Sequence, residues 1–192
     1  MTGYFRASLA AAALLALPSK GLQAQQPTIA TTDAQPSIRD LDRLVGKWTF
    51  YDEATPLAGF DYREEGTIEC RYAVDDAYIR CDGVGHRNGK TRSFVEYINY
   101  NFITEQFERV GIFGNHPAKA VFAMTLSDDG KMIKQKGTPM QQRGGYFTRN
   151  WGKIRFVNDD HYIWETRVNR SDEDPDHWPL KFISEYKRVK LE

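Results

Sequence analysis

The sequence predicts an all-β domain, folded as one up-and-down antiparallel barrel of about ten strands with a short N-terminal helix plugging one end. After residue 46 the chain consists of runs of alternating, β-branched and aromatic residues, separated by Gly, Asp, Asn and Pro. Nearly every connection is too short for a parallel crossover, and closure would remove the exposed strand edges. The ten candidate strands span residues 47–52, 60–73, 77–84, 91–101, 105–113, 118–126, 131–136, 146–157, 160–169 and 179–189.

Four of the connections carry residues that favour tight hairpin turns. They are Asp75-Asp76, Asn88-Gly89, Asp128-Asp129-Gly130 and Asn158-Asp159-Asp160. No internal repeat is evident, and no domain boundary appears after residue 37. The chain from 37 to 192 is therefore expected to form a single barrel.

The N-terminal residues indicate export. Arg6 precedes an unbroken run of small and apolar residues, Ser8 to Leu17, and a small residue, Ala24, stands before the expected cleavage. A run of about ten apolar residues suits a signal peptide and is too short to span a bilayer. We therefore expect a signal peptide over 1–24, a disordered leader rich in Gln, Thr, Pro and Ala over 25–36, and a periplasmic or secreted protein.

A short helix is predicted at the start of the domain. Ser37 is a suitable N-cap, with Asp40 three residues later in a capping-box-like position. Ile38, Leu41 and Leu44 fall on one face at helical spacing. We expect two to three turns, ended by Gly46, that cover one open end of the barrel.

The two cysteines are expected to form a structural disulfide. Cys70 and Cys81 are equidistant from the Asp75-Asp76 turn, so a hairpin there places them opposite each other. Directly opposed residues in an antiparallel pair lie within disulfide range. A disulfide also agrees with an oxidising compartment.

The charge balance disfavours two classes of partner. Without the predicted signal peptide the chain carries 24 Lys and Arg against 26 Asp and Glu, a net charge of −2. A nearly neutral chain lacks the basic surface that binds nucleic acid or anionic membranes. We expect neither partner, and the sequence leaves the oligomeric state open, a homodimer included.

The strands carry aromatic residues mixed with a few polar and charged ones, which is unusual for a plain packed core. A barrel of this size holds one small ligand, and such an inner face would make an apolar pocket with polar anchors. Alternation alone does not say which face of a strand is the inner one. An interior Arg would hold a carboxylate or phenolate, or equally pair with Glu96 or Glu165. The candidate ligand-binding residues are Tyr97, Asn99, Arg109, Phe113, Arg149, Trp151 and Trp164.

Three residues are candidates for acid–base chemistry: Glu96, Glu165 and His116, which lies in a loop rich in Gly, Asn and Pro. The histidines are widely spaced, with no H-x-H or H-E-x-x-H pattern. We therefore expect no metal site and no cofactor. No G-x-S-x-G motif or phosphate-binding glycine loop is present.

Three segments resemble secreted bacterial lipocalin-like proteins of unknown function. They are Leu44-Val45-Gly46-Lys47-Trp48, Val157-Asn158-Asp159-Asp160-His161 and Glu185-Tyr186-Lys187-Arg188, and the resemblance runs from about 41 to 189. It implies a calycin-type barrel and brings no established catalytic residue with it.

Related barrels differ from this chain at their ligand residues. Fatty-acid-binding proteins hold a carboxylate with an inward Arg-x-Tyr on the last strand, where this chain has Ser184-Glu185-Tyr186. Haem-binding barrels with a similar Gly-x-Trp need an axial histidine, and no histidine here lies in the middle of a predicted strand. A few barrels of the superfamily are lyases or isomerases for small aromatic acids.

Two functions fit the sequence. The first is a carrier that binds a small apolar or aromatic molecule in the barrel. The alternative is a cofactor-independent lyase, isomerase or hydrolase that acts on a small aromatic or carbonyl substrate in the same cavity. A titratable group with a strongly shifted pKa beside a cationic group favours the enzyme, whereas one isolated polar anchor favours the carrier.

Overall fold

A computed structural model describes residues 36–116, 118–142, 145, 147–169, 174 and 177–190. The predicted signal peptide (1–24) and all of the predicted leader (25–36) except Pro36 lie outside the described residues. None of the helices in the part of the chain that is described is long and apolar enough to cross a membrane.

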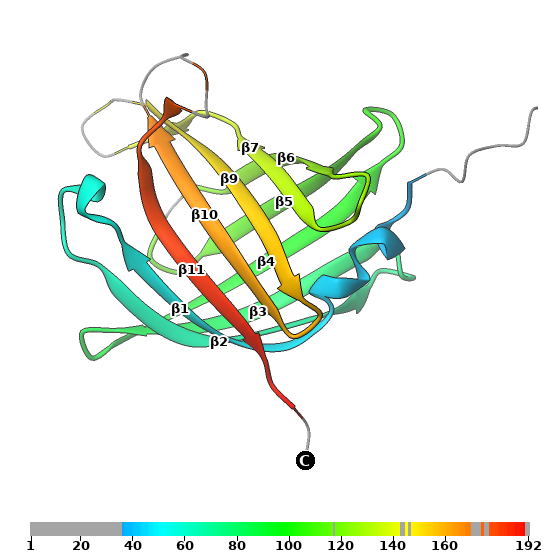
Figure 1. Cartoon of the computed structure of the whole chain (residues 1–192), viewed down its shortest axis with the longest axis horizontal. Helices are drawn as coiled ribbons and strands as arrows, with labels where there is room; N and C mark the ends of the chain where they lie inside the picture. Colours follow the sequence, from blue (N-terminus) through cyan, green and yellow to red (C-terminus); the bar gives the residue numbers. More distant parts are fainter. Residues whose placement is uncertain are drawn as a thin grey trace, which may run out of the picture. The chain divides into compact units, whose positions relative to one another are not determined.

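The described residues form a closed antiparallel barrel (Figure 1), which confirms the predicted fold class. Ten strands follow one another around the barrel in chain order, and pairing of β9 with β10 and of β11 with β1 closes it. A further two-residue strand, β8, pairs only with β9. The strands are β1 (Gly46–Ala54), β2 (Arg63–Ala73), β3 (Tyr78–Arg87), β4 (Lys90–Asn101), β5 (Gln106–Phe113), β6 (Ala120–Leu126), β7 (Met132–Gly137), β8 (Met140–Gln141), β9 (Phe147–Asn158), β10 (His161–Asn169) and β11 (Leu180–Arg188).

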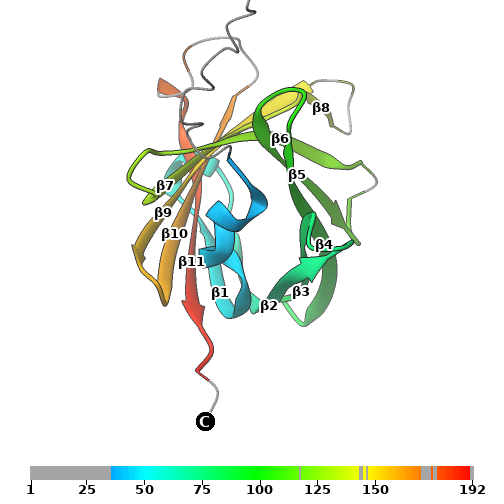
Figure 2. The same ribbon diagram turned by 90° about the vertical axis from the view of Figure 1, so that its right-hand side faces the viewer.

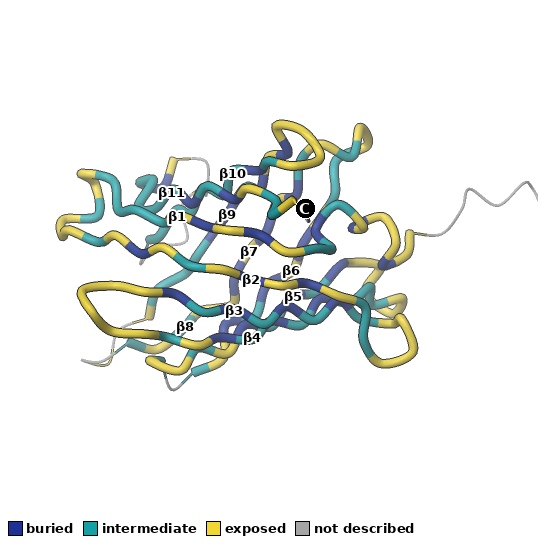
Figure 3. Tube along the Cα trace, turned by 90° about the horizontal axis from the view of Figure 1, so that it is seen from below, coloured by how far each residue is buried: buried dark blue, intermediate teal, exposed yellow. Residues whose placement is uncertain are grey.

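Alternating burial along the strands separates the inner face from the outer one (Figure 3). In β4, Phe94, Glu96 and Ile98 are buried, whereas Val95 and Tyr97 between them are only partly buried. The structure thus decides the question that alternation in the sequence left open: the face with Glu96 is the inner one.

The predicted N-terminal plug is present, in a tighter form than expected. Ser37 caps η1 (Ile38–Leu44), a 3₁₀ helix, and the Ser37–Asp40 capping box is complete. Its apolar residues Ile38, Leu41 and Leu44 are buried in the barrel core. Viewed toward this end of the barrel, η1 lies between the strands of opposite walls (Figure 2).

Trp48 closes the same end from inside. Its ring is fully buried, its indole Nε1 donates to the Leu44 carbonyl oxygen at 3.0 Å, and its edge meets Tyr162 with ring centroids 4.8 Å apart. The Arg188 guanidinium lies over the ring, 4.1 Å from its centroid. Gly46 leaves room for this guanidinium, because a Cβ at that position would overlap Arg188 Nη1.

Arg188 also joins three segments through backbone carbonyls. Its Nη1 donates to Val45 O at 2.7 Å, and its Nη2 donates to Arg43 O at 3.1 Å and to Asp159 O at 3.0 Å. The last strand is thereby tied to the plug, to the start of β1 and to the β9–β10 turn.

The disulfide prediction is confirmed. Cys70 of β2 and Cys81 of β3 face each other in register, with Cα atoms 4.0 Å apart, and are bonded. The turn between them includes Val74, Asp75 and Asp76, which all have positive φ angles of 52–61°. Both cysteines are buried in the core, so the disulfide links two neighbouring strands from inside the barrel.

The contacts of Arg188 predict a large effect on stability. Arg188→Met keeps apolar length but removes the four hydrogen bonds to three carbonyl oxygens and the charge over Trp48. We expect the free energy of unfolding to fall by at least about 3 kcal/mol, since hydrogen bonds from charged groups each contribute roughly 1.5–3 kcal/mol. Chemical denaturation measures this loss. Lys190→Met is the control, because the Lys190 side chain is 83% exposed, and an equal loss in both variants would contradict this role of Arg188.

Candidate functional site

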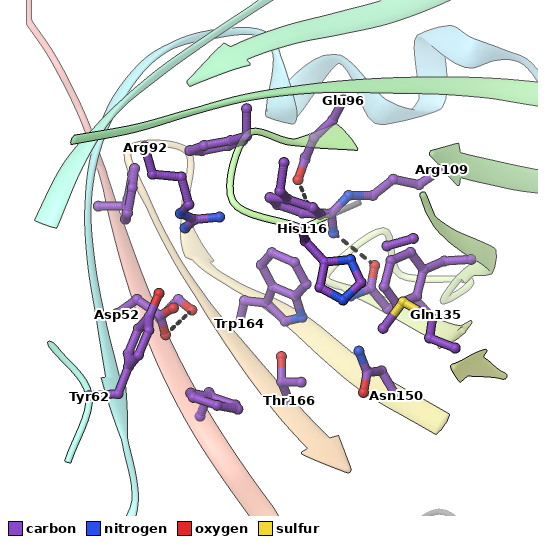
Figure 4. A pocket seen from close by; sticks show the side chains of 18 of the residues that line it. Asp52, Tyr62, Arg92, Glu96, Arg109, His116, Gln135, Asn150, Trp164 and Thr166 are labelled. Carbon is purple, nitrogen blue, oxygen red and sulfur yellow. Dashed lines mark hydrogen bonds and ion pairs between the residues drawn. The ribbon is translucent and has the colours of Figure 1, made fainter. Parts of the chain in front are cut away.

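A cavity of about 360 Å³ occupies the barrel at the end distant from η1 (Figure 4). Its size lies within the range of small-molecule sites. The wall combines aromatic rings with a small number of charged and amide side chains. The lining residues are Phe50, Asp52, Tyr62, Arg92, Phe94, Glu96, Arg109, Phe113, Asn115, His116, Ala120, Phe122, Gln135, Met140, Asn150, Trp151, Trp164, Thr166, Phe182, Ser184 and Tyr186.

The structure brings six of the ten sequence-predicted site residues into this wall: Glu96, Arg109, Phe113, His116, Trp151 and Trp164. Trp151 is a special case among them. It alternates with Asn150 and Gly152, and its ring lies 4.6 Å from the ammonium of Lys153, on the same face of β9. Its side chain therefore belongs to the outer face of the strand.

The other four predicted residues do not line the cavity: Tyr97, Asn99, Arg149 and Glu165. Tyr97 and Asn99 alternate with the buried Glu96 and Ile98, and Glu165 alternates with Trp164 and Thr166. The period of two along a strand thus places them on the opposite face.

The deep part of the cavity contains an ion pair. Arg109 Nη2 donates to Glu96 Oε1, and Arg109 Nη1 donates to Gln135 Oε1 at 3.1 Å (Figure 4). The Arg109 and Glu96 side chains are only 4% and 8% exposed. Of the two roles considered for an interior arginine, holding a ligand anion or pairing with a glutamate, the structure shows the second. Arg109 therefore does not offer a free guanidinium to a ligand.

Trp164 packs directly on this ion pair. The Arg109 guanidinium lies 4.1 Å from the centroid of the Trp164 ring, a cation–π distance. The neighbouring strand β9 has a glycine here, because a Cβ at Gly152 would lie 2.7 Å from both Trp164 Nε1 and Gln135 Nε2. Trp164 Nε1 is buried and has no hydrogen-bond partner among the described residues. This part of the site is therefore crowded and polar.

A second ion pair lies nearer the end distant from η1. Arg92 Nε donates to Glu64 Oε1 at 2.9 Å, Arg92 Nη2 donates to Glu64 Oε2, and the Tyr62 hydroxyl donates to Glu64 Oε2 at 2.7 Å. Burial opposes ionisation of Glu64, but the hydrogen bonds from Arg92 and Tyr62 outweigh it and lower the pKa of Glu64. Arg92, like Arg109, is therefore neutralised by a glutamate.

Asp52 is the third carboxylate of the site and has no such partner. It accepts a hydrogen bond from the Ser184 hydroxyl at 2.9 Å and forms no ion pair with the described residues. Burial raises the pKa of Asp52 to about 6, the Ser184 hydrogen bond opposes this rise, and the nearby charge of Glu64 adds to it. Asp52 is thus a carboxyl group that titrates near neutral pH.

Sequence reasoning missed Asp52, Tyr62, Glu64, Arg92 and Gln135. One available signal was the alternation of Trp48, Phe50 and Asp52 in the first strand, which puts all three on one face. The Glu64–Arg92 pair carried no local signal, since its members belong to strands β2 and β4, which are not neighbours.

His116 lies in the connection between β5 and β6, at the edge of the cavity. Its backbone N–H donates to Phe113 O at 3.0 Å, and its Nδ1 lies 3.2 Å from both the backbone nitrogen and the carbonyl oxygen of Ala118. The described residues contain no group of three or more His, Cys, Asp or Glu side chains arranged to hold a metal ion.

The chain matches no protein-family model and no curated protein sequence. Among solved structures it resembles the S-type phycobiliprotein lyase from Guillardia theta, with 14% identity, a TM-score of 0.55, and coverage of 82% of this chain and 96% of that one. It also aligns with a redesigned β-barrel (8% identity, TM-score 0.42, 79% and 96% covered) and with EF1p2_mFAP2b bound to DFHBI (12% identity, TM-score 0.39, 79% and 98% covered). At such identities the likeness to the lyase shows the fold alone. The observed barrel fits the lipocalin-like, calycin-type architecture that the sequence motifs implied.

Breaking the Glu96–Arg109 ion pair should lower the stability of the protein. Glu96→Gln leaves the Arg109 guanidinium buried without a counter-charge. We expect a loss of about 3–5 kcal/mol in the free energy of unfolding, as for other buried pairs that lose one partner. In the double variant with Arg109→Met, which removes both charges, much of this loss should be recovered. Urea denaturation of the two variants provides the measurement, and equal losses would show that the charge is not the cause.

The raised pKa of Asp52 predicts that this residue lowers the stability of the protein to an extent that depends on pH. Folding raises the pKa from 3.8 to about 6, so the folded state binds more protons than the unfolded one between these values. The contribution of Asp52 to stability therefore falls as pH rises through this window. Asp52→Asn removes this titration. The free energy of unfolding of the variant, relative to that of the wild type, should therefore rise from pH 4 to pH 7 by up to about 3 kcal/mol, at roughly 1.4 kcal/mol per pKa unit. Unfolding curves of both proteins across this range measure the effect. A stability difference that stays constant with pH would show that burial does not raise the pKa of Asp52.

Proposed function

We propose that this protein is an exported lipocalin-like barrel that binds one small, mostly aromatic or apolar molecule inside its cavity. The proposal rests on the cavity of about 360 Å³, which is lined by aromatic rings and by a small number of polar side chains. Such a composition is typical of small-molecule sites. The signal-peptide pattern and the Cys70–Cys81 disulfide support export to the periplasm or beyond, and the sequence motifs support a place among secreted bacterial lipocalin-like proteins.

The two ion pairs narrow the ligand class. Arg92 and Arg109 are each bound to a glutamate, so neither offers the free forked donor that holds a carboxylate or a phosphate. On the last strand, Ser184 stands where fatty-acid-binding barrels have arginine, and it binds Asp52 instead. These contacts disfavour an anionic ligand.

A second candidate function is cofactor-independent acid–base catalysis on a small aromatic or carbonyl substrate. It is favoured by Asp52, whose pKa is raised to about 6 and which lies in the same cavity as the Arg92 cation. A general acid or base works best when its pKa is near the working pH. Incubation with small-molecule extracts of the host, followed by mass spectrometry, tests this function: turnover by the wild type that Asp52→Asn abolishes supports it.

A fluorescent neutral probe tests ligand binding. N-phenyl-1-naphthylamine, which brightens in apolar surroundings, should bind the wild-type barrel at one site. Thr166→Trp fills the cavity from β10 and should weaken binding at least about tenfold, because loss of a buried aromatic contact exceeds 1.4 kcal/mol. Ile163→Trp adds the same ring on the opposite face of β10 and serves as the matched control.

Equal probe binding by the three proteins would place the probe outside the cavity and refute the binding function. Native mass spectrometry of protein purified from its own host is the complementary measurement. A retained small molecule in wild-type protein that is lost in Thr166→Trp supports the function directly.

A further inference from the structure

We propose that the cavity selects a cation, namely a primary or secondary amine carried on an aromatic or apolar body, with its ammonium group against Asp52. The inference rests on the proposed binding function and specifies its ligand class. It follows from the charges of the site, from the contacts of Asp52 and from the rings that surround it.

The described charged groups in and beside the cavity are unevenly paired. The guanidinium groups of Arg92 and Arg109 and the carboxylates of Asp52 and Glu96 line the cavity, and Glu64 lies beside it against Arg92. The glutamates are already bound to the arginines. Asp52 is left with one neutral hydrogen bond, from Ser184. Asp52 is therefore a carboxylate of the cavity that has no ion-pair partner among the described residues.

The groups around Asp52 do not supply the missing cation. Glu53 on its own strand and Glu64 on β2 are acidic and disfavour its charge, and Arg92 on β4 acts on it without forming an ion pair. The phenols of Tyr62 and Tyr186 are kept neutral, because burial raises their pKa values.

One further arginine lies close to this cluster without lining the cavity. The Arg87 guanidinium of β3 lies over the Tyr62 ring, 4.5 Å from its centroid. Its charge contributes to the low pKa of Glu64 and is not among the charges that act most strongly on Asp52. The negative charge at Asp52 is thus left for a ligand to compensate.

The rings in the same part of the cavity suit an organic ammonium ion. Phe50 lies two residues before Asp52 on the inner face of β1 and contacts Tyr186, with centroids 5.7 Å apart. Phe182 lies two residues before Ser184 on β11 and contacts Tyr62 at 5.6 Å. Aromatic faces attract cations, most strongly where water is excluded. A carboxylate bordered by such rings recognises an amine both by charge and by its apolar body.

The titration of Asp52 agrees with this inference. Burial without a counter-charge raises its pKa to about 6, and a bound ammonium would lower it again. At neutral pH the carboxylate is mostly ionised and ready to bind a cation. Below pH 6 it becomes protonated, so affinity for an amine should fall, whereas affinity for a neutral molecule should not.

A matched set of ligands tests the inference by isothermal titration calorimetry at pH 7.5. The set is 2-(1-naphthyl)ethylamine, 2-(1-naphthyl)ethanol and 1-naphthylacetate, which share the ring and differ in charge. We expect the amine to bind at least about tenfold more tightly than the alcohol, because charge-assisted hydrogen bonds are roughly twice as strong as neutral ones. The carboxylate should bind most weakly. At pH 5 the amine should lose up to about tenfold in affinity as Asp52 is protonated.

Two neighbouring substitutions assign the effect to Asp52. Asp52→Asn should remove the preference for the amine and its pH dependence, while it still binds the alcohol. Glu53→Gln removes the same charge one residue away, on the opposite face of β1, and should keep the preference. Retained alcohol binding shows that each variant is folded.

The outcomes separate the two proposals. If the alcohol or the carboxylate binds wild-type protein as tightly as the amine, cation selection is overturned and the binding function stands. The inference is also overturned if Asp52→Asn keeps the amine preference. If none of the three ligands and no neutral naphthyl probe binds, the binding function itself fails.

Discussion

The closed end of the barrel depends on the Arg188 guanidinium. It lies on the fully buried ring of Trp48 and donates to carbonyl oxygens of three segments: the plug, the start of β1 and the β9–β10 turn. These segments are brought together only when the last strand pairs with the first. Trp48 and the plug fill one end with packed side chains, and the cavity of about 360 Å³ lies toward the other end.

The charged interior is the second constraint on this molecule. Removing two charges from water costs several kcal/mol per ion, so a buried pair is retained only with close geometry and further hydrogen bonds. Both arginines of the cavity meet this condition through glutamates, and Arg109 also through Gln135. Asp52 does not meet this condition, and burial of its carboxyl group therefore raises its pKa. Among the described residues that line the cavity, Asp52 is thus a carboxylate without an ion-pair partner.

Local patterns predicted the strands well and the site only in part. All ten long strands lie within a few residues of their predicted limits, because alternation and turn residues act over short distances. The helix was expected to be ended by Gly46; its last residue is Leu44, Val45 is its C-cap, and Gly46 begins β1, where the close approach of Arg188 requires a glycine. The candidates Tyr97, Asn99 and Glu165 lie on the outer face, since alternation has two solutions until a strand is placed in the barrel.

The sequence by itself determined the fold class, the order of the strands, the turns, the capped plug and the facing cysteines. Each of these depends on residues close together in the chain or symmetric about one turn. Only the tertiary structure decided which face of each strand is inner, that Arg109 and Arg92 are paired with glutamates, and that Asp52 has no ion-pair partner among the described residues. Those facts depend on side chains that meet across the barrel from distant strands, and closure of the barrel is what sets their distances.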